Sequence, residues 1–259
     1  MKKDIGLKFE KLVEIMRKLR APDGCPWDRE QTPQSIAPYL LEETYETLEA
    51  IDKGDNKETR EELGDLLLQV VFQAQMGEEA GHMHIGDVID GISEKLIRRH
   101  PHVFGDEKVK DSAHVLQNWE KIKKQKEGKK SLLGTVPKAL PALLKAYRLG
   151  QKASRVGFDW TDVEGVLAKI EEESRELHEA YASGKRKDIE HEYGDLLLIL
   201  ANLGRFLEID PETALRKATQ RFIDRFSWME EAIAKKKIEM QSLSLEEWDK
   251  LWEQAKASL

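Results

Sequence analysis

The chain has little of the chemistry on which several protein classes depend. Its 259 residues include a single cysteine, Cys25, which excludes an intrachain disulfide and a zinc site made of several cysteines of one chain. The longest apolar runs, such as residues 196–201, are far shorter than the ~18 residues that a membrane span needs. The first residues also lack the apolar stretch of a signal peptide, so the sequence predicts a cytoplasmic protein without a membrane partner.

Strong positive charge is also absent. Lys and Arg number 42 against 49 Asp and Glu, which gives a formal net charge of −7. A net-acidic chain without a strongly basic domain is a poor general binder of nucleic acids, so we expect no nucleic-acid partner. The apolar fraction of 40% is nevertheless high enough for a globular chain that buries a core.

Helical periodicity dominates what is present. Between residues 7 and 20, for example, Leu12, Ile15 and Leu19 lie on one apolar stripe. No convincing alternation typical of a strand appears, so the predicted fold class is all-α, with a loop at 21–34 where Pro and Gly interrupt the pattern. The predicted helices lie at about 7–20, 35–53, 56–80, 85–99, 112–127, 138–154, 162–182, 186–207, 211–238 and 245–257.

An internal repeat is the strongest feature of the sequence. When residues 42–68 are compared with 172–198, thirteen of the 27 positions are identical without a gap. Shorter matches flank this core at slightly different shifts, for example residues 24–27 with 157–160. The repeat predicts two tandem domains of one fold, residues 1–128 and 138–259, joined by a linker at 129–137.

Each repeat carries acidic residues in the pattern E-E-x-x-E followed by E-x-G-D. Acids three residues apart lie on one face of a helix, one turn from each other. A turn near Gly54 or Gly184 would fold two such helices together and bring their carboxylates face to face. The first repeat has Glu42, Glu43, Glu46, Glu62 and Asp65, and the second has Glu172, Glu173, Glu176, Glu192 and Asp195.

Carboxylates gathered in this way repel one another. Two of them about 4 Å apart repel by roughly 4 kcal/mol at a near-surface dielectric, so the group needs protons, a Lys or Arg partner, or a divalent cation. Solvated helix faces are the plain alternative, but they have no need to keep one spacing in both repeats. Ligands that are all oxygens suit Mg²⁺ or Mn²⁺. A di-iron centre would need Glu-x-x-His on paired helices, whereas Glu79 and His82 form that pattern without a counterpart in the second half.

Cationic and aromatic residues recur at matching positions in both halves. A pair of Lys or Arg four residues apart can hold phosphate oxygens, and an indole can stack on any base. Salt bridges and a tryptophan packed in the core are the structural alternatives. Together with the carboxylates, these residues describe a site for a nucleotide with a polyphosphate tail. The first half has Lys95, Arg99, Trp119 and Lys123, and the second has Arg221, Arg225, Trp252 and Lys256.

With these motifs the sequence resembles the MazG family of nucleoside triphosphate pyrophosphohydrolases, over nearly the whole chain. The resemblance implies an all-α fold in which helices of two chains build four-helix bundles, so a homodimer is expected. It also implies Mg²⁺-dependent hydrolysis of NTPs and dNTPs to the monophosphate and pyrophosphate. The residues that carry it are GCPWDREQT (24–32), LLEETYE (40–46), EELGDLLLQVVF (61–72), RRHPHVF (98–104), VGFDW (156–160) and EYGDLLL (192–198).

The resemblance implies roles for single residues. The Mg²⁺ ligands would be Glu173, Glu176, Glu192 and Asp195, with Glu43, Glu46, Glu62 and Asp65 as the second copy. The nucleotide would be held by Arg221, where the family usually has Lys, and by Arg225, Trp252 and Lys256. The second repeat, the usual catalytic copy, adds Lys169 and His191 where the first has Tyr39 and Glu61, and an extra cation should help a triphosphate approach.

The expected reaction is attack of water on the α-phosphorus, with pyrophosphate leaving. One of the glutamates, such as Glu172, would act as general base. Two alternatives belong to other classes: a non-catalytic helical module that senses nucleotides or docks a protein, and a purely structural dimer. Binding without product would indicate the sensing module, and the absence of any Mg²⁺-dependent change would indicate the structural dimer.

Overall fold

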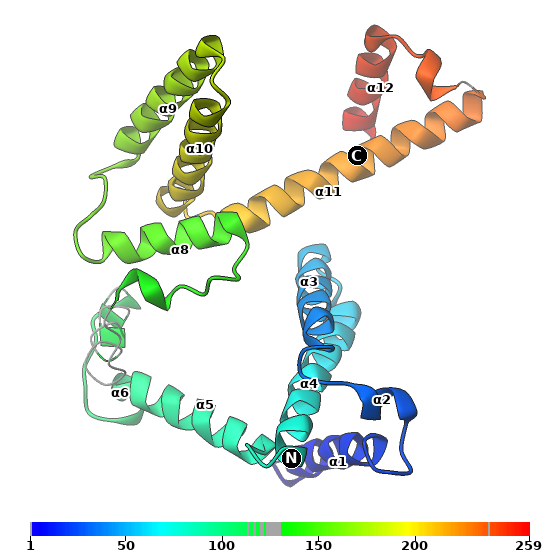
Figure 1. The fold of residues 1–259 in the computed structure, drawn as a ribbon, viewed down its shortest axis with the longest axis vertical. Helices are drawn as coiled ribbons and strands as arrows, with labels where there is room; N and C mark the ends of the chain where they lie inside the picture. Colours follow the sequence, from blue (N-terminus) through cyan, green and yellow to red (C-terminus); the bar gives the residue numbers. More distant parts are fainter. Residues whose placement is uncertain (1, 113, 116–117, 120–121, 123–130, 238) are drawn as a thin grey trace. The chain divides into compact units, whose positions relative to one another are not determined.

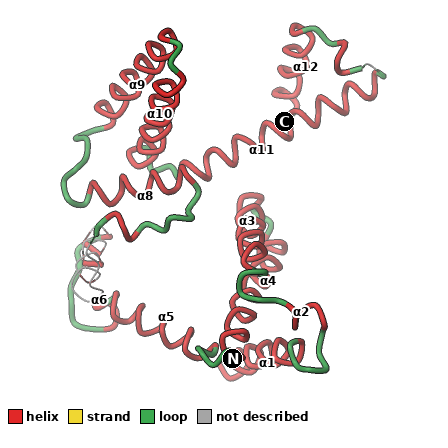
Figure 2. Tube along the Cα trace, in the orientation of Figure 1, coloured by secondary structure: helices red, strands yellow, loops and turns green. Residues whose placement is uncertain are grey.

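The computed structural model describes the chain except for residues 1, 113, 116–117, 120–121, 123–130 and 238. The described residues form α-helices and short 3₁₀ turns and include no strand (Figure 1, Figure 2), so the all-α prediction is confirmed. They fall into two compact units, Met1–Trp119 and Glu120–Leu259, here called the first and the second unit. None of the described helices combines the length and apolar content that crossing a bilayer requires.

The first unit is built on a helix pair, α3 (Ala37–Lys53) and α4 (Asn56–Glu79), which pack along each other. Gly54 ends α3 in the left-handed conformation, with φ of 70°, and the Asp55 carboxylate then caps α4 by accepting backbone N–H bonds. This tight turn makes the pair antiparallel. The remaining helices of the unit are α1 (Lys2–Leu19), α2 (Pro26–Glu30), α5 (Ile85–Arg99) and α6 (Pro101–Phe104).

The core of the first unit lies where α1 packs against α4. Met16 of α1 and Phe72 of α4 belong to its buried cluster, with 1% and 3% of their surfaces exposed. Burying side chains of this size stabilises the fold by about 1.5–3 kcal/mol each. The carboxylate-bearing helix α4 is thereby fixed against α1.

The second unit repeats this arrangement. Its helix pair is α9 (Val163–Ser183) and α10 (Arg186–Phe206), joined through Gly184, whose φ is 72°. Helix α10 packs against both α9 and α8 (Ala142–Ser154), as α4 packs against α3 and α1.

Two further helices follow the pair. Helix α11 (Pro211–Lys236) begins after the N-cap Asp210, and α12 (Leu245–Ser258) begins with a capping box formed by Ser244 and Glu247. Their shared core lies at the C-terminal half of α11 and contains Met229, Ile233, Leu251 and Ala255. Short 3₁₀ turns lie at η1 (Leu133–Thr135) and η2 (Met240–Ser242).

Most predicted helices are present with ends within a few residues of their expected positions. The prediction of a loop at 21–34 is wrong in part, because Pro26 at the first helical position and Asp28 in the first turn support the short helix α2. The helix predicted at 138–154 begins at Ala142, since Pro141 serves as its N-cap. Most of the helix predicted at 112–127 lies outside the described residues.

The tandem organisation is evident in the fold, with one carboxylate-bearing helix pair in each unit. The contacts divide the chain between Trp119 and Glu120, close to the predicted end of the first domain at 128. Part of the linker predicted at 129–137 lies outside the described residues, and the exact boundaries stay predictions.

Candidate active site

The helix pair of the second unit brings three predicted carboxylates together. Oxygen atoms of Glu173 and Glu176 on α9 and of Glu192 on α10 all lie within 4.8 Å of one another. Asp195 is one turn further along α10 and is not part of this trio. Its Oδ2 lies 3.5 Å from Nε2 of His191. The E-x-x-E pair and the first member of E-x-G-D therefore meet as predicted, whereas Asp195 points to a neighbour on its own helix.

Glu173 is the buried member of this group, with 5% of its surface exposed. Its Oε1 lies 2.8 Å from Nζ of Lys169, which also donates a hydrogen bond of 2.9 Å to Oε1 of Glu172. These two carboxylates raise the pKa of Lys169 above its usual range, with Glu173 as the larger influence. The ammonium of Lys169 is therefore held on Glu172 and Glu173 as their counter-charge, one helical turn along α9.

The second carboxylate oxygen of Glu173, Oε2, indicates what kind of ligand this group could bind. Oε2 is buried and has no hydrogen-bond partner among the residues that the structure describes. A buried charged oxygen without a partner is costly, and a cation would satisfy it. Because the clustered donors are all carboxylate oxygens, Mg²⁺ or Mn²⁺ fits them better than a softer metal.

The first unit forms a related but different group. Oxygen atoms of Glu43, Glu62 and Asp65 lie within 4.8 Å of one another, and none of these three side chains is fully buried. Glu46 is outside this trio, although its charge acts on the other two glutamates. Among the described residues no Lys or Arg forms an ion pair with the trio, and the position of Lys169 is taken by Tyr39.

Because no counter-charge offsets the repulsion, the pKa values of two glutamates in the first unit are raised. Partial burial, followed by repulsion from Asp65 and Glu46, raises the pKa of Glu43. The pKa of Glu62 is also raised, by desolvation and then by the charges of Glu46 and Asp65. Without a cation, the first unit therefore holds its carboxylate protons more tightly than an unfolded chain does.

The predicted cationic and aromatic residues of the second unit lie on α11 and α12. The guanidinium carbon of Arg225 is 5.6 Å from the ring centre of Trp252, and the ring centre of Phe222 is 5.4 Å from that of Trp252. Lys256 forms an ion pair with Glu253, and Arg221 is exposed. Trp252 therefore packs within the α11–α12 core and supports Arg225.

Helices α11 and α12 carry these residues, and the contact between the two helices does not bring the residues to the carboxylates. Helix α12 packs on α11, whereas the carboxylates lie on the α9–α10 pair, and Figure 1 draws α12 apart from that pair. Within the described residues, no ion pair links Arg221, Arg225 or Lys256 to the carboxylate group. One chain thus presents the two halves of the predicted site separately.

The corresponding residues of the first half are partly described. Lys95 and Arg99 lie on α5, and Trp119 packs edge-on against His100 at 5.0 Å between ring centres. Lys123 lies outside the described residues. His100 is the N-cap residue of the short helix α6, and His102 lies within that helix.

A cavity near the carboxylates of the second unit was not predicted from the sequence. Asn202 of α10 lines a cavity in the second unit, whereas Phe72 stands at the matching position in the first. The signal was present in the repeat alignment as an apolar residue in one copy and an amide in the other. Its meaning depends on packing, which the alignment does not give.

Comparison with known proteins agrees with the repeat. The model of the MazG nucleotide pyrophosphohydrolase domain matches residues 31–104 and again 161–229. The nucleoside triphosphate pyrophosphohydrolase/pyrophosphatase MazG of Thermotoga maritima is 52% identical over 98% of this chain and 98% of its own length. The nucleoside triphosphate pyrophosphohydrolase of Escherichia coli K12 is 45% identical over 96% of this chain and 97% of its own. A solved mazG-related protein from Thermotoga maritima, 29% identical over 45% of this chain, aligns with a TM-score of 0.40.

Both carboxylate-bearing helix pairs fall inside the two matched segments, which together span more than half of the chain. The two relatives cover almost all of the rest. The chain therefore belongs to the MazG nucleotide pyrophosphohydrolase family.

Proposed function

We propose that the protein hydrolyses nucleoside triphosphates, NTPs and dNTPs alike, to the monophosphate and pyrophosphate in a Mg²⁺-dependent reaction at the second unit. The observation that carries the proposal is the carboxylate group of α9 and α10, in which a buried Glu173 oxygen has no hydrogen-bond partner among the described residues. Relatives covering nearly the whole chain bear the name of this activity. We assign catalysis to the second unit because its carboxylates are better buried and carry a counter-charge.

Four carboxylates would hold the metal: Glu173, Glu176, Glu192 and Asp195. When bound there, Mg²⁺ would neutralise phosphate charge and lower the pKa of a water molecule. Lys169 already offsets the repulsion among these carboxylates in the free protein. When a triphosphate binds, the Nζ atom of Lys169 would pair with a phosphate oxygen instead of with Glu172.

Proton removal from the attacking water falls to Glu172. It is adjacent to the metal-binding group, remains 44% exposed, and shares the ammonium of Lys169 with Glu173. The oxygen of water forms a bond to the α-phosphorus while the bond from the α-phosphorus to the α–β bridging oxygen breaks. The water proton passes to the Glu172 carboxylate, and pyrophosphate leaves with the bridging oxygen.

Arg221, Arg225 and Lys256 would stabilise the negative charge on the departing pyrophosphate. Arginine is suited to this because its planar guanidinium binds two phosphate oxygens at once. The guanidinium of Arg225 lies over the ring of Trp252, a cation–π contact that would favour this orientation of the side chain. Stacking of Trp252 on the base, and contributions from His191, stay predictions.

A homodimer would bring the cationic residues of α11 and α12 next to the carboxylates of α9 and α10. The α9–α10 pair exposes large apolar side chains on its outer surface, with Tyr181, Tyr193, Leu197 and Leu200 each at least 39% exposed. Exposed apolar surface of this extent is typical of an interaction site, and two such helix pairs would complete a four-helix bundle. A second chain would then supply the α11–α12 cations to the carboxylates of the first.

The direct test is Asp195→Asn, which removes one ligand charge and keeps the side-chain shape. We expect a loss of about 10²–10³-fold in turnover of ATP and dATP, with the dimer intact by light scattering. Asp65→Asn is the matched change in the first unit and should leave most turnover. Near-normal activity of Asp195→Asn would contradict the site, and nucleotide binding without any product in the unmodified chain would indicate a sensing module.

A further inference from the structure

A cavity of about 240 Å³ lies in the second unit between α8 and the segment that precedes it, residues 135–140, and its lining is basic. The cations that line it are Arg148, Lys152 and Arg155, and none of the described residues that line it is acidic. A concave surface with charge of one sign focuses its electric field, which favours a ligand of the opposite sign. The cavity is therefore suited to an anion.

The three cations share one face at the end of α8. Lys152 follows Arg148 by four residues, and Arg155, the C-cap residue, follows after three more. The helix rises by about 10 Å from the first to the last of them. The helix dipole accounts for a cation in the last turn, such as Lys152, but not for Arg148, which lies a turn earlier.

Arg148 has most of its hydrogen-bonding capacity left for a ligand. Its Nη1 donates a bond of 2.8 Å to Oε1 of Gln151, which also lines the cavity. A guanidinium carries five N–H donors, and within the described residues no carboxylate pairs with this one. An oxyanion in the cavity would therefore meet a charged donor that no described acid neutralises.

The basic character belongs to the second repeat alone. Residues 128–158 include seven Lys or Arg and no Asp or Glu, in a chain whose acids outnumber its bases. At the shift that matches residues 24–27 with 157–160, the first repeat has Ile15, Leu19 and Pro22 in place of the three cations. The cations are thus not required by the helix scaffold that the two units share.

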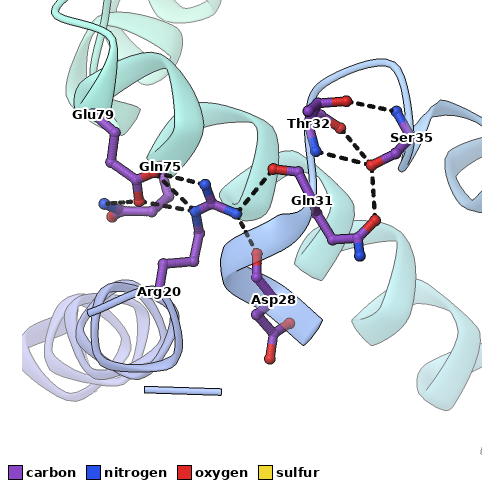
Figure 3. A network of polar contacts seen from close by, with 7 residues as sticks. All are labelled: Arg20, Asp28, Gln31, Thr32, Ser35, Gln75 and Glu79. Atoms are coloured by element: carbon purple, nitrogen blue, oxygen red, sulfur yellow. Dashed lines mark hydrogen bonds and ion pairs between the residues drawn. The ribbon is translucent and has the colours of Figure 1, made fainter. Parts of the chain in front are cut away.

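In the first unit, a cation beside α1 has a structural role instead. Figure 3 shows the guanidinium of Arg20, directly after α1, between the carboxylate of Glu79 and backbone oxygens of the α2 region. In the second unit, Arg205 in the last turn of α10 forms the comparable ion pair, with Asp159 in the loop before α9. This fastening of helix to loop therefore does not use the cations of α8.

We propose that this cavity is an anion site that binds inorganic pyrophosphate, made of other residues than the carboxylate group and the cations of α11 and α12. Arg and Lys are the usual protein partners of phosphate oxygens. The cavity is smaller than the about 300–1,000 Å³ of pockets for larger organic ligands, which favours a small anion over a nucleotide. A ligand with two phosphoryl groups can contact more of the cationic row than orthophosphate can. The inference goes beyond the proposed function and stands without it.

The test is titration calorimetry of the full-length chain with sodium pyrophosphate in EDTA, where no Mg²⁺ can carry the anion to the carboxylates. We expect saturable binding that is weakened at least about tenfold in Arg148→Gln/Lys152→Gln/Arg155→Gln. The matched control removes the same charge from three exposed residues around the start of α10, Lys185→Gln/Arg186→Gln/Lys187→Gln, and should keep the affinity within about twofold.

Four results would overturn the assignment: no saturable binding by the unmodified chain up to about 10 mM, equal loss in both triple variants, orthophosphate or sulfate bound as tightly as pyrophosphate, or loss in Arg221→Gln/Arg225→Gln alone. The last would place the anion on α11.

A second variant covers the case in which the cavity variant fails to fold by circular dichroism. Arg148→Ile/Lys152→Leu gives the second repeat the residues of the first, and it should also weaken pyrophosphate binding; unchanged affinity would overturn the assignment. Turnover of ATP separates this inference from the proposed function. Turnover without pyrophosphate binding in EDTA would contradict the anion site alone, and binding without turnover would contradict the proposed function alone.

Discussion

The two units share one helix-pair scaffold and differ in what surrounds its carboxylates. In the second unit Glu173 is buried and is paired with Lys169. In the first unit Glu43 is less buried, and Tyr39 stands where that lysine would be. A duplicated scaffold can thus keep its ligand spacing while the neighbouring residues decide how much charge it tolerates.

The same difference extends along the helices toward α1 and α8. Phe72 is buried in the core of the first unit, whereas Asn202, at the matching position of the second, lines a cavity. Filling a core with an aromatic ring adds stability, and leaving it open sacrifices packing for room. We infer that the second unit carries the chemistry, and the variants described below test that division.

The largest expected effect distinguishes the two matching glutamates, Glu173 of the second unit and Glu43 of the first. Glu173→Gln removes a ligand charge and should lower turnover of ATP by about 10²–10³-fold, whereas Glu43→Gln should retain most of it. Steady-state rates of the two variants at saturating Mg²⁺ provide the measurement. Equal losses in both variants would mean that the units contribute equally and that the division is wrong.

A second prediction concerns the separation of the site's two halves. Asp195→Asn and Arg225→Ala chains, each with little activity, should regain about a quarter of normal activity when unfolded together and refolded as mixed dimers. Half of the dimers are then mixed, and each mixed dimer has one intact site of two. No recovery, in mixtures that contain mixed dimers by mass spectrometry, would place both residue sets in one chain.

Lys169 offers a smaller effect on stability. Lys169→Met should lower the stability of the metal-free protein, because the buried carboxylate of Glu173 loses its counter-charge. Urea unfolding with EDTA and with Mg²⁺ measures this loss. We expect Mg²⁺ to restore most of it by taking the place of the ammonium; a loss of the same size with Mg²⁺ would argue that no cation binds there.

The smallest effect is a pH dependence of the first unit. The pKa values of Glu43 and Glu62 lie above the ordinary 4.5, so the folded state binds more protons than the unfolded state between 4.5 and the raised values. Stability of the metal-free protein should therefore fall as pH rises through this window. Thermal unfolding in EDTA should show a shallower fall for Glu43→Gln/Glu62→Gln, and an unchanged slope would refute the assignment.

Much of the fold was predictable because it depends on local signals. Apolar stripes, the N-cap Asp210, the capping box at Ser244 and the glycine turns at Gly54 and Gly184 specify helices from nearby residues alone. The short helix α2 was missed because proline was interpreted as a loop signal. Proline also favours the first position of a helix, which is where Pro26 lies.

The site was predictable only in part. Spacing of three along a helix fixed which acids share a face, and Glu173, Glu176 and Glu192 do meet. Lys169 contacts Glu172 and Glu173 within its own helix, whereas the cavity at Asn202 depends on which side chains fill the space between helices that are distant in sequence. Periodicity contains no information on such packing.

The most direct test of the central claim is product analysis. The full-length chain is incubated with each NTP and dNTP, with Mg²⁺ or with EDTA, and the nucleotides are separated by chromatography. We predict monophosphate and pyrophosphate with Mg²⁺, and neither with EDTA. Diphosphate with orthophosphate, or no product from any nucleotide, would contradict the account.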